Sequence, residues 1–335
     1  MSEIQSRAVS FLSIRDVLFL AFAFLVLIFL ITPEPLGIQR HVFAITWSSI
    51  FLEALCFMLI GSVMSGFIEE FVPRDLIERM MFGNRIAVVT SSAAMGFIFP
   101  VCECAIVLVV RRLLKKGLPL TAGIAFMLAA PIINPVVIWS TSVAYQGQWF
   151  VIISRTLFGY GIACMTAIFV GSIFNADRAL LSGVSATSHN RDSGYDHVRP
   201  NHRTPWHRIA SSLHHACDDL FDMAPYLVAG TFVAAFVRSS IPAHVIQHLA
   251  ERPILSINGM MGLAFTLNLC SEADAFIAAS FSGIVNLAGQ MAFMVLGPML
   301  DIKLLLMYRS VFRNKFIILL AGVVGSLVFL FMLFY

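Results

Sequence analysis

Long apolar runs separated by short polar stretches dominate the chain. Seven runs approach the length that a helix needs to cross a bilayer core, about 20 residues. They lie at residues 17–32, 48–70, 119–143, 150–174, 214–237, 287–302 and 314–335. Two further runs, 86–110 and 254–280, carry polar residues near their middles. This pattern predicts an all-α polytopic membrane protein.

Composition agrees with the hydropathy pattern. Charged residues make up 12% of the 335-residue chain, hydrophobic residues make up 59%, and the mean hydropathy is +0.87. A soluble domain carries about twice that share of charge. The net charge of +3 does not indicate nucleic-acid binding, and six cysteines scattered along apolar segments do not predict a secreted disulfide framework. The first apolar run lacks a small-residue cleavage pattern, so it is expected to be an anchor helix.

The two halves of the chain repeat each other at an offset that drifts from 167 to 169 residues. The matched positions are Phe126 with Phe293, Pro131 with Pro298, Asn134 with Asp301, Cys102 with Cys270, Ala105 with Ala273, Glu53 with Asp222, Gly61 with Gly230 and Pro73 with Pro242. This ordered set predicts a duplicated unit of three spanning helices and one interrupted segment. The predicted divisions are an anchor helix and loop at 1–44, repeat 1 at 45–175, a cytoplasmic histidine-rich loop at 176–210 and repeat 2 at 211–335.

The distribution of Lys and Arg indicates how the interrupted segments are threaded. If all nine segments span, the loop charges divide 10 against 11. If 86–110 and 254–280 are re-entrant hairpins, 18 of these basic residues, including Lys303, lie on one side of the membrane and 3 lie on the other. Because basic loops stay cytoplasmic, the uneven split favours hairpins and a cytoplasmic N-terminus. Three spans and one hairpin per unit make the repeats inverted, a common transporter design. Nine spanning helices remain the alternative.

Both predicted hairpin tips carry thiols and carboxylates. The first tip carries Cys102, Glu103 and Cys104, with Pro100 at the chain reversal, and the second carries Asn268, Cys270, Ser271, Glu272 and Asp274. Ionisable groups at membrane depth are functional-site candidates, and thiolates prefer thiophilic metals. The sequence therefore predicts a midplane substrate site in which Cys102, Cys104 and Cys270 are metal or metalloid ligands. Alternatively, the cysteines are small core residues and the acids pair with polar backbone.

Four other polar residues recur at matched positions. Asn134 and Asp301 each follow a helix-breaking proline by three residues, so we expect them to hydrogen-bond the freed backbone or the solute. A purely structural kink is the alternative. Glu53 and Asp222 lie early on the helices that start each repeat. They are candidate proton-coupling carboxylates, and the alternative is that they are interfacial or capping acids.

Several motifs resemble one known family. They are Pro-Val-Cys-Glu-Cys at 100–104, Arg-Arg-Leu-Leu-Lys-Lys-Gly-Leu-Pro at 111–119, Ala-Ala-Pro-Ile-Ile-Asn-Pro at 129–135, Leu-Cys-Ser-Glu-Ala-Asp-Ala-Phe at 269–276 and Gly-Pro-Met-Leu-Asp-Ile-Lys at 297–303. The chain is similar over about residues 45–335 to the predicted permeases that include YraQ, YcgR and the methylarsenite-efflux permeases, and most of all to the YcgR branch.

The resemblance implies an inner-membrane permease, and for the YcgR branch it implies one subunit of a two-component membrane permease. Arsenical exporters of the family rely on cysteine in the first motif, which implies such a role for Cys102 and Cys104. Here a glutamate separates them and the second motif is acidic, which leaves a metal cation or another small solute open.

We therefore expect a permease for a small solute, a thiophilic metal or metalloid species, working in efflux. The alternative is a non-transporting partner or sensor subunit that docks a second membrane subunit through the 176–210 loop. Expected partners are the solute, membrane lipid and that subunit, with no nucleic acid and no cofactor. An enzyme is not expected, because the sequence has no Cys-x-x-Cys pair, cofactor motif or soluble catalytic domain.

Overall fold

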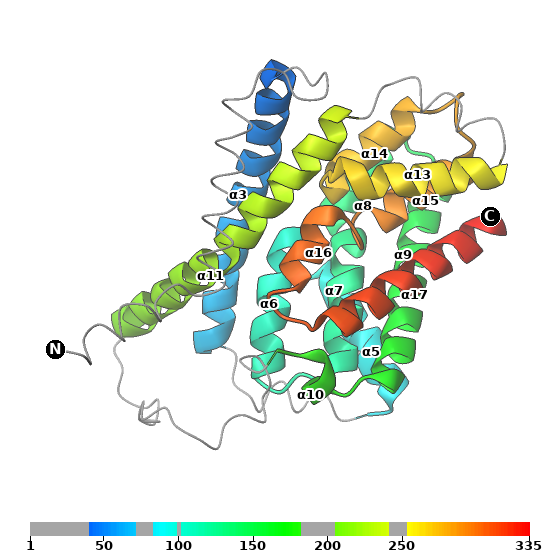
Figure 1. Cartoon of the computed structure of the whole chain (residues 1–335). Helices are drawn as coiled ribbons and strands as arrows, with labels where there is room; N and C mark the ends of the chain where they lie inside the picture. Colours follow the sequence, from blue (N-terminus) through cyan, green and yellow to red (C-terminus); the bar gives the residue numbers. More distant parts are fainter. Residues whose placement is uncertain (1–39, 72–82, 99–101, 182–204, 241–252) are drawn as a thin grey trace.

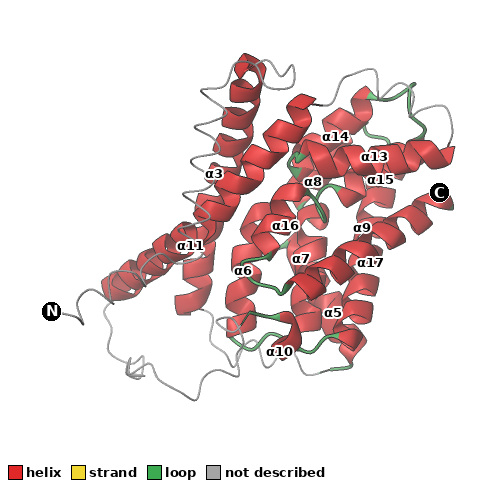
Figure 2. Ribbon diagram, viewed as in Figure 1, coloured by secondary structure: helices red, strands yellow, loops and turns green. Residues whose placement is uncertain are grey.

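A computed structural model describes residues 40–71, 83–98, 102–181, 205–240 and 253–335. Within these ranges the secondary structure is helical, with two isolated β-bridges and no strand (Figure 2). The predicted anchor helix at 17–32, the tip residue Pro100 and most of the histidine-rich loop lie outside the described residues.

The helices follow one another along the chain as labelled in Figure 1. They are α3 (Arg40–Phe71), α5 (Arg85–Ala94), the 3₁₀ turn η2 (Met95–Phe97), α6 (Glu103–Lys115), α7 (Leu120–Ile133), α8 (Pro135–Ala144), α9 (Trp149–Ile173), α10 (Ala176–Ala179), α11 (Pro205–Ser240), α13 (Pro253–Leu267), α14 (Ser271–Ser280), α15 (Leu287–Leu296), α16 (Ile302–Tyr308) and α17 (Asn314–Leu333). Both α10 and the start of α11 fall inside the stretch predicted as a loop.

Helices α3 and α11 lie side by side along much of their length (Figure 1). Phe43 and Trp47 of α3 stack edge-on against Phe232 of α11, with ring centroids 5.2 Å and 5.8 Å apart. Gly66 of α3 meets the backbone of Ser212, so only a residue without a Cβ fits there. Aromatic packing at one end and a close backbone approach at the other hold the pair together.

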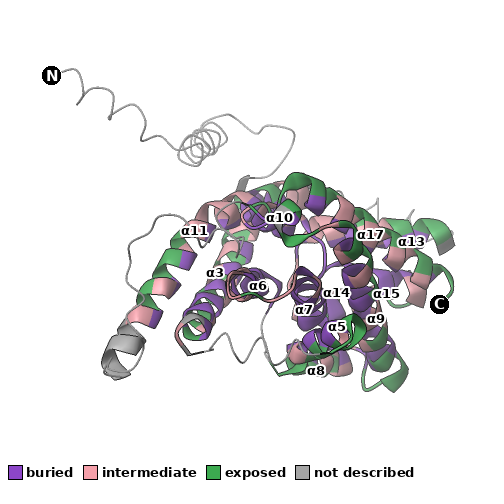
Figure 3. Cartoon of the chain, turned by 90° about the horizontal axis from the view of Figure 1, so that it is seen from below, coloured by how far each residue is buried: buried purple, intermediate pink, exposed green. Residues whose placement is uncertain are grey.

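The remaining helices form a bundle around α7 and α15. Helix α7 is apolar on every face and buries every residue except Thr121, as expected for a helix surrounded by protein. Its neighbours are α5, α6 and α9, while α13 and α17 pack on α15. The inner ribbons of the bundle are accordingly the buried ones in Figure 3.

Five helical stretches are long and apolar enough to cross a membrane. They are His41–Ile68, Leu120–Ala144, Trp149–Ile173, Ser211–Ser239 and Asn314–Leu333. The prediction of a multi-pass, all-α protein is thereby confirmed, and these stretches match five of the seven expected spans. The expected span at 287–302 contains the break predicted at its proline, since α15 ends at Leu296 and the chain leaves the helix until α16 begins at Ile302.

Both interrupted segments are broken helices. Arg85, at the start of α5, donates to the Ile168 carbonyl near the end of α9, 3.4 Å away. A Cβ on Gly123, at the start of α7, would lie 3.0 Å from Leu114 near the end of α6. The start of α5 and the end of α6 therefore lie at the end of the bundle where α7 begins and α9 finishes.

The second broken helix has the opposite placement. Ser256, at the start of α13, donates to Asn286 at the start of α15, 3.0 Å away. Gln290 of α15 accepts 2.8 Å from Tyr145, which follows α8, and also contacts Ser282, which follows α14. In Figure 1, α5 accordingly lies low while α13 and α14 lie high.

Candidate functional site

Two of the four helix breaks are capped by the polar residues that follow the prolines. Helix α7 ends at Ile133, and Asn134 takes an extended conformation and accepts from the Val136 backbone N–H at 3.0 Å. Asp301 caps α16 in the same way by accepting from the Leu304 N–H. Both side chains are buried. The sequence thus located both breaks, and both side chains satisfy backbone donors.

A buried ion pair joins the two halves at the centre. The Lys303 ammonium lies 3.2 Å from Glu103 Oε1 and 3.7 Å from Asp301 Oδ2. Lys303 is 3% exposed, and both carboxylates are equally buried. Glu103 begins α6 in the first half, whereas Lys303 and Asp301 lie at the second helix break of the other half. The three groups therefore connect breaks that are 200 residues apart in sequence.

Asn268 holds the Lys303 backbone in place. It has φ 51°, in the left-handed region that asparagine tolerates better than most residues. Its Oδ1 accepts from the Lys303 N–H at 2.9 Å, and its Nδ2 donates to the Phe265 and Thr266 carbonyls. Asn268 therefore closes the end of α13 and fixes the position of α16.

A second buried cation, Arg155 of α9, lies beside the start of α14. It is 1% exposed and donates to Thr141 Oγ1 at 2.6 Å and to the Ser271 carbonyl at 2.8 Å. It also interacts electrostatically with Asp274, Glu272 and Cys270. The acidic first turn of α14 thus faces a fixed positive charge from the first half.

The centre nevertheless holds more acceptor oxygens than its described donors satisfy. One oxygen each of Glu103, Glu272, Asp274 and Asp301 is buried without a hydrogen-bond partner, as is the Ser271 hydroxyl. Such atoms are costly to bury, since the free energy of desolvation is not recovered. A proton or a cation would satisfy them.

The cysteines at the starts of α6 and α14 lie around this cluster. Cys102 and Cys104 are buried and contact each other, and both interact with the Lys303 charge. Cys270 is partly buried and interacts with Glu53. The proton-coupling role of Glu53 stays a prediction. Among the described residues, no three or more His, Cys, Asp or Glu side chains are arranged to hold a metal ion. The role of the three cysteines as ligands stays a prediction.

Asp222, the repeat partner of Glu53, lies elsewhere. It pairs with Arg111 of α6 at 3.1 Å, and its side chain is 44% exposed. One turn earlier on α11, Asp219 is buried. It accepts from Arg112 Nε and Nη2, each at 2.8 Å, and from the Ser65 hydroxyl. These pairs fasten the end of α6 to the α3–α11 pair. The repeat therefore brings only one of its two matched acids to the centre.

Comparison with known proteins identifies the family. The profile of a family described as "Predicted permease" matches residues 39–335, which is most of the chain. The chain belongs to the predicted permease family.

Two relatives of this permease cover most of its length. The UPF0718 protein YcgR of Bacillus subtilis is 40% identical over 275 residues, covering 81% of this chain and 89% of the relative. A protein of Streptococcus mutans named "Putative two-component membrane permease complex subunit" is 37% identical over 287 residues, covering 85% and 92%. No solved structure matches. The resemblance to the YcgR branch is confirmed, and the family indicates a transporter rather than an enzyme.

Sequence reasoning missed the two cations of the permease's centre. It assigned Lys303 to a basic loop, which the structure corrects by burying it against Glu103. Without Lys303, the count of basic residues on the side predicted to be cytoplasmic falls from 18 to 17. Arg155 is a single charge within a 25-residue apolar helix, a signal that marks a functional site by default. Its partners follow only from the fold.

Proposed function

We propose that this permease binds its solute at the centre, between the starts of α6, α8, α14 and α16. The observation that carries the proposal is the surplus of buried carboxylate over fixed positive charge. Four carboxylates, those of Glu103, Glu272, Asp274 and Asp301, surround two basic residues. Buried charges without partners are rare in stable proteins, and inside membrane proteins they mark ion and proton pathways.

The geometry of a transporter also requires a centre that both faces can reach. We propose that α5–α6 and α13–α14 are re-entrant hairpins entering from opposite faces, as parts of an inverted repeat. The Arg85–Ile168 and Ser256–Asn286 bonds support this. The first places the start of α5 beside the end of α9, and the second places the start of α13 beside the start of α15, at the other end of the bundle. The basic excess at the end of α6 supports a cytoplasmic placement for that end.

The thiols define the class of solute. Cys102, Cys104 and Cys270 are soft donors next to hard carboxylates, a mixture that suits a thiophilic metal or metalloid species whose charge the acids balance. The solute binds transiently and leaves by ligand exchange, so it is cargo and not a permanently bound metal. Efflux driven by proton exchange is the proposed direction, with Glu53 as a proton carrier next to Cys270, with which it interacts. Asp222, tied to Arg111, is the weaker candidate.

Lys303 has a specific role in this scheme. Its ammonium pairs with the carboxylates that a cationic solute would use, so it acts as a tethered counter-ion for them. A cation entering the site competes with the ammonium for Glu103. Because Glu103 and Lys303 belong to different halves, that exchange loosens the contact between α6 and α16 and links occupancy to movement.

The experiment that tests the proposal measures growth of a metal-sensitive bacterial strain expressing the full chain. Cultures are challenged with trivalent arsenicals, zinc, copper and tellurite. We expect Cys102→Ser, Cys104→Ser and Glu272→Gln to reduce tolerance to at least one of these species. Cys56→Ser and Cys217→Ser are matched controls, because both cysteines are exposed and outside the centre. Unchanged tolerance of all three central variants to every species would contradict the proposal.

A second candidate, a non-transporting partner subunit, is favoured by one observation, the similarity to the Streptococcus mutans protein named as a complex subunit. Reconstitution of the chain alone into liposomes separates the two functions. Flux of the solute without any second protein supports the permease. Flux that requires a second membrane protein, together with loss of pull-down when residues 185–204 are deleted, supports the partner.

A further inference from the structure

A basic pocket lies at the end of the bundle where α9 finishes and α17 begins. Its volume is about 610 Å³, and its basic lining residues are Arg178, Arg309, Arg313 and Lys315. Two segments far apart in sequence build it. The Leu181 N–H donates to the Val311 carbonyl at 3.0 Å, and the Arg313 N–H donates to the Ala179 carbonyl at 2.8 Å. The pocket is therefore formed by backbone pairing and not only by mobile side chains.

The positive charge of this pocket is not neutralised within the described protein. None of the ion pairs among the described residues involves Arg178, Arg309 or Lys315. Arg313 uses its Nε to bind the Leu180 carbonyl at 3.1 Å. Like charges around one cavity raise the local potential and favour an anion, and guanidinium groups match the geometry of phosphate.

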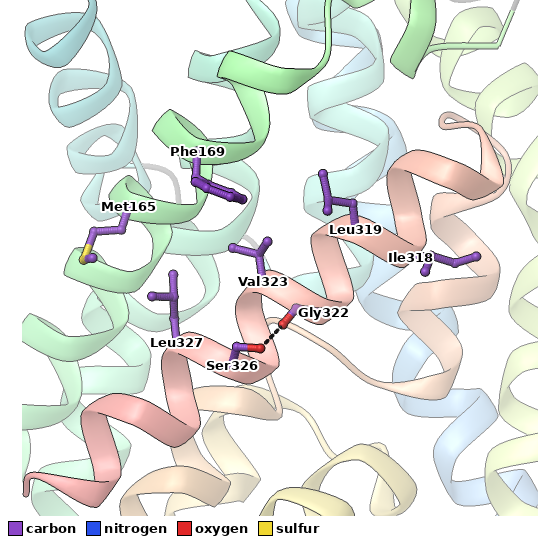
Figure 4. A pocket seen from close by; sticks show the side chains of 8 residues that line it. All are labelled: Met165, Phe169, Ile318, Leu319, Gly322, Val323, Ser326 and Leu327. Atoms are coloured by element: carbon purple, nitrogen blue, oxygen red, sulfur yellow. Dashed lines mark hydrogen bonds between the residues drawn. The ribbon is translucent and has the colours of Figure 1, made fainter.

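An apolar groove lies between α9 and α17, next to the pocket (Figure 4). Its volume is about 500 Å³, and Met165, Phe169, Ile318 and Leu327 are among the side chains that line it. Ile318 is 72% exposed. A Cβ on Gly322 would meet no atom within 4 Å, so the groove is open at its middle.

The pocket and the groove follow one another along the same two helices. Lys315 of the pocket and Ile318 and Gly322 of the groove lie three and four residues apart, which places them on one face of α17. On the other side, Phe174 lines the pocket five residues after Phe169 of the groove. A phosphate in the pocket therefore lies within about one to two helical turns of the groove.

We propose that an anionic phospholipid binds here, with its phosphate in the basic pocket and an acyl chain in the α9–α17 groove. Charge complementarity selects this occupant over a zwitterionic lipid, and the apolar groove selects it over free phosphate. Anionic lipids are enriched in the cytoplasmic leaflet, which is the face proposed above for this end of the bundle.

The test is native mass spectrometry of the full chain purified in detergent and titrated with phosphatidylglycerol or phosphatidylcholine. We expect preferential retention of phosphatidylglycerol. Each basic residue near a membrane surface contributes about a fivefold gain in affinity, so Arg178→Gln/Arg309→Gln is expected to lower retention about 25-fold. Arg85→Gln is the charge control, because Arg85 is exposed at the same end but outside the pocket. We expect it to change retention less than twofold.

A second variant tests the groove separately. Gly322→Leu fills open space in the groove and is expected to reduce phosphatidylglycerol retention at least fivefold, as judged from the apolar area it displaces. Gly325→Leu is its control, since Gly325 also has open space around it and does not line the groove. Elution as one peak in size-exclusion chromatography verifies that all variants fold.

Three outcomes would overturn the proposal. Equal losses for Arg85→Gln and Arg178→Gln/Arg309→Gln would mean that the whole basic surface attracts lipid. Displacement by millimolar inorganic phosphate, with no effect of Gly322→Leu, would identify a soluble phosphate as the ligand. Undiminished lipid retention in Gly322→Leu, combined with loss of a co-purifying membrane protein, would assign the groove to a transmembrane helix of a partner.

Discussion

The ion pair between Lys303 and Glu103 makes a strong prediction about stability. Lys303→Met removes an ammonium that lies 3.2 Å from Glu103 and 3.7 Å from Asp301. At an effective dielectric constant of 20, each contact is worth about 5 kcal/mol of attraction. Burying the ions costs several kcal/mol per ion, so the net contribution of the pair is much smaller than this sum.

Removing one partner is a different matter, because it leaves buried carboxylates without their counter-ion. We therefore expect Lys303→Met to lower the free energy of unfolding by about 3–5 kcal/mol. Glu103→Gln removes one acid and leaves Lys303 paired with Asp301, so its cost is expected to be about 1–3 kcal/mol. The double variant carries less uncompensated charge than Lys303→Met and is expected to be more stable than it.

The assay is unfolding in mixed detergent micelles titrated with dodecyl sulfate, which yields free energies for the four members of a double-mutant cycle. A coupling of at least about 1.5 kcal/mol between the two positions is expected. Lys315→Met is the control, because Lys315 is exposed and makes no ion pair among the described residues. It should change stability by less than about 0.5 kcal/mol. Additive single effects, within about 0.5 kcal/mol, would refute the reasoning.

Three further predictions use the same assay. Arg155→Met should lower the free energy of unfolding by about 3–5 kcal/mol, since Arg155 is buried beside the acids of α14. Arg155→Lys should recover only part of that loss, because one amine does not reach both the Thr141 hydroxyl and the Ser271 carbonyl. Gly61→Val should cost more than about 1–3 kcal/mol, because a Cβ there would overlap the start of α6, whereas Gly322→Val should be nearly neutral. Asp219→Asn should cost about 2–4 kcal/mol by breaking a buried bidentate pair, whereas Asp218→Asn, in an exposed pair, should change stability by less than about 0.5 kcal/mol.

The spanning helices were predictable because hydropathy is a local property of about 20 consecutive residues. The break within 287–302 was predictable from a different local signal. A hydropathy window passes smoothly over Pro298 and Asp301, but a proline followed three residues later by a polar side chain marks where the chain leaves the helix between Leu296 and Ile302. The matched break at Asn134 carries the same signal, and there α8 begins directly at Pro135 and keeps the two helices in one apolar stretch.

The central site was predictable in part. Glu103, Glu272 and Asp274 stood out as carboxylates within apolar sequence, and they do lie near one another's charges. The partner of Glu103 did not stand out, because Lys303 is 200 residues away and follows a helix break that resembles the edge of a loop. Pairing across such a separation depends on how the two halves pack, which no local pattern contains. The inverted repeat and the hairpin topology stay predictions of the sequence.

The balance of unpaired atoms at the centre bears on which solute the proposed site would accept. Four carboxylate oxygens and the Ser271 hydroxyl lack hydrogen-bond partners, whereas Arg155 Nε is the corresponding donor among the central cations. An anionic solute would add further acceptors to a centre that already has too many, and by pairing with Lys303 it would leave the buried Glu103 carboxylate without its counter-ion. A cationic solute, or a neutral one that releases protons to the acids, supplies what these oxygens need. The thiols of Cys102 and Cys104 lie beside the same ammonium, so a thiophilic cation that takes its place gains sulfur and oxygen ligands together.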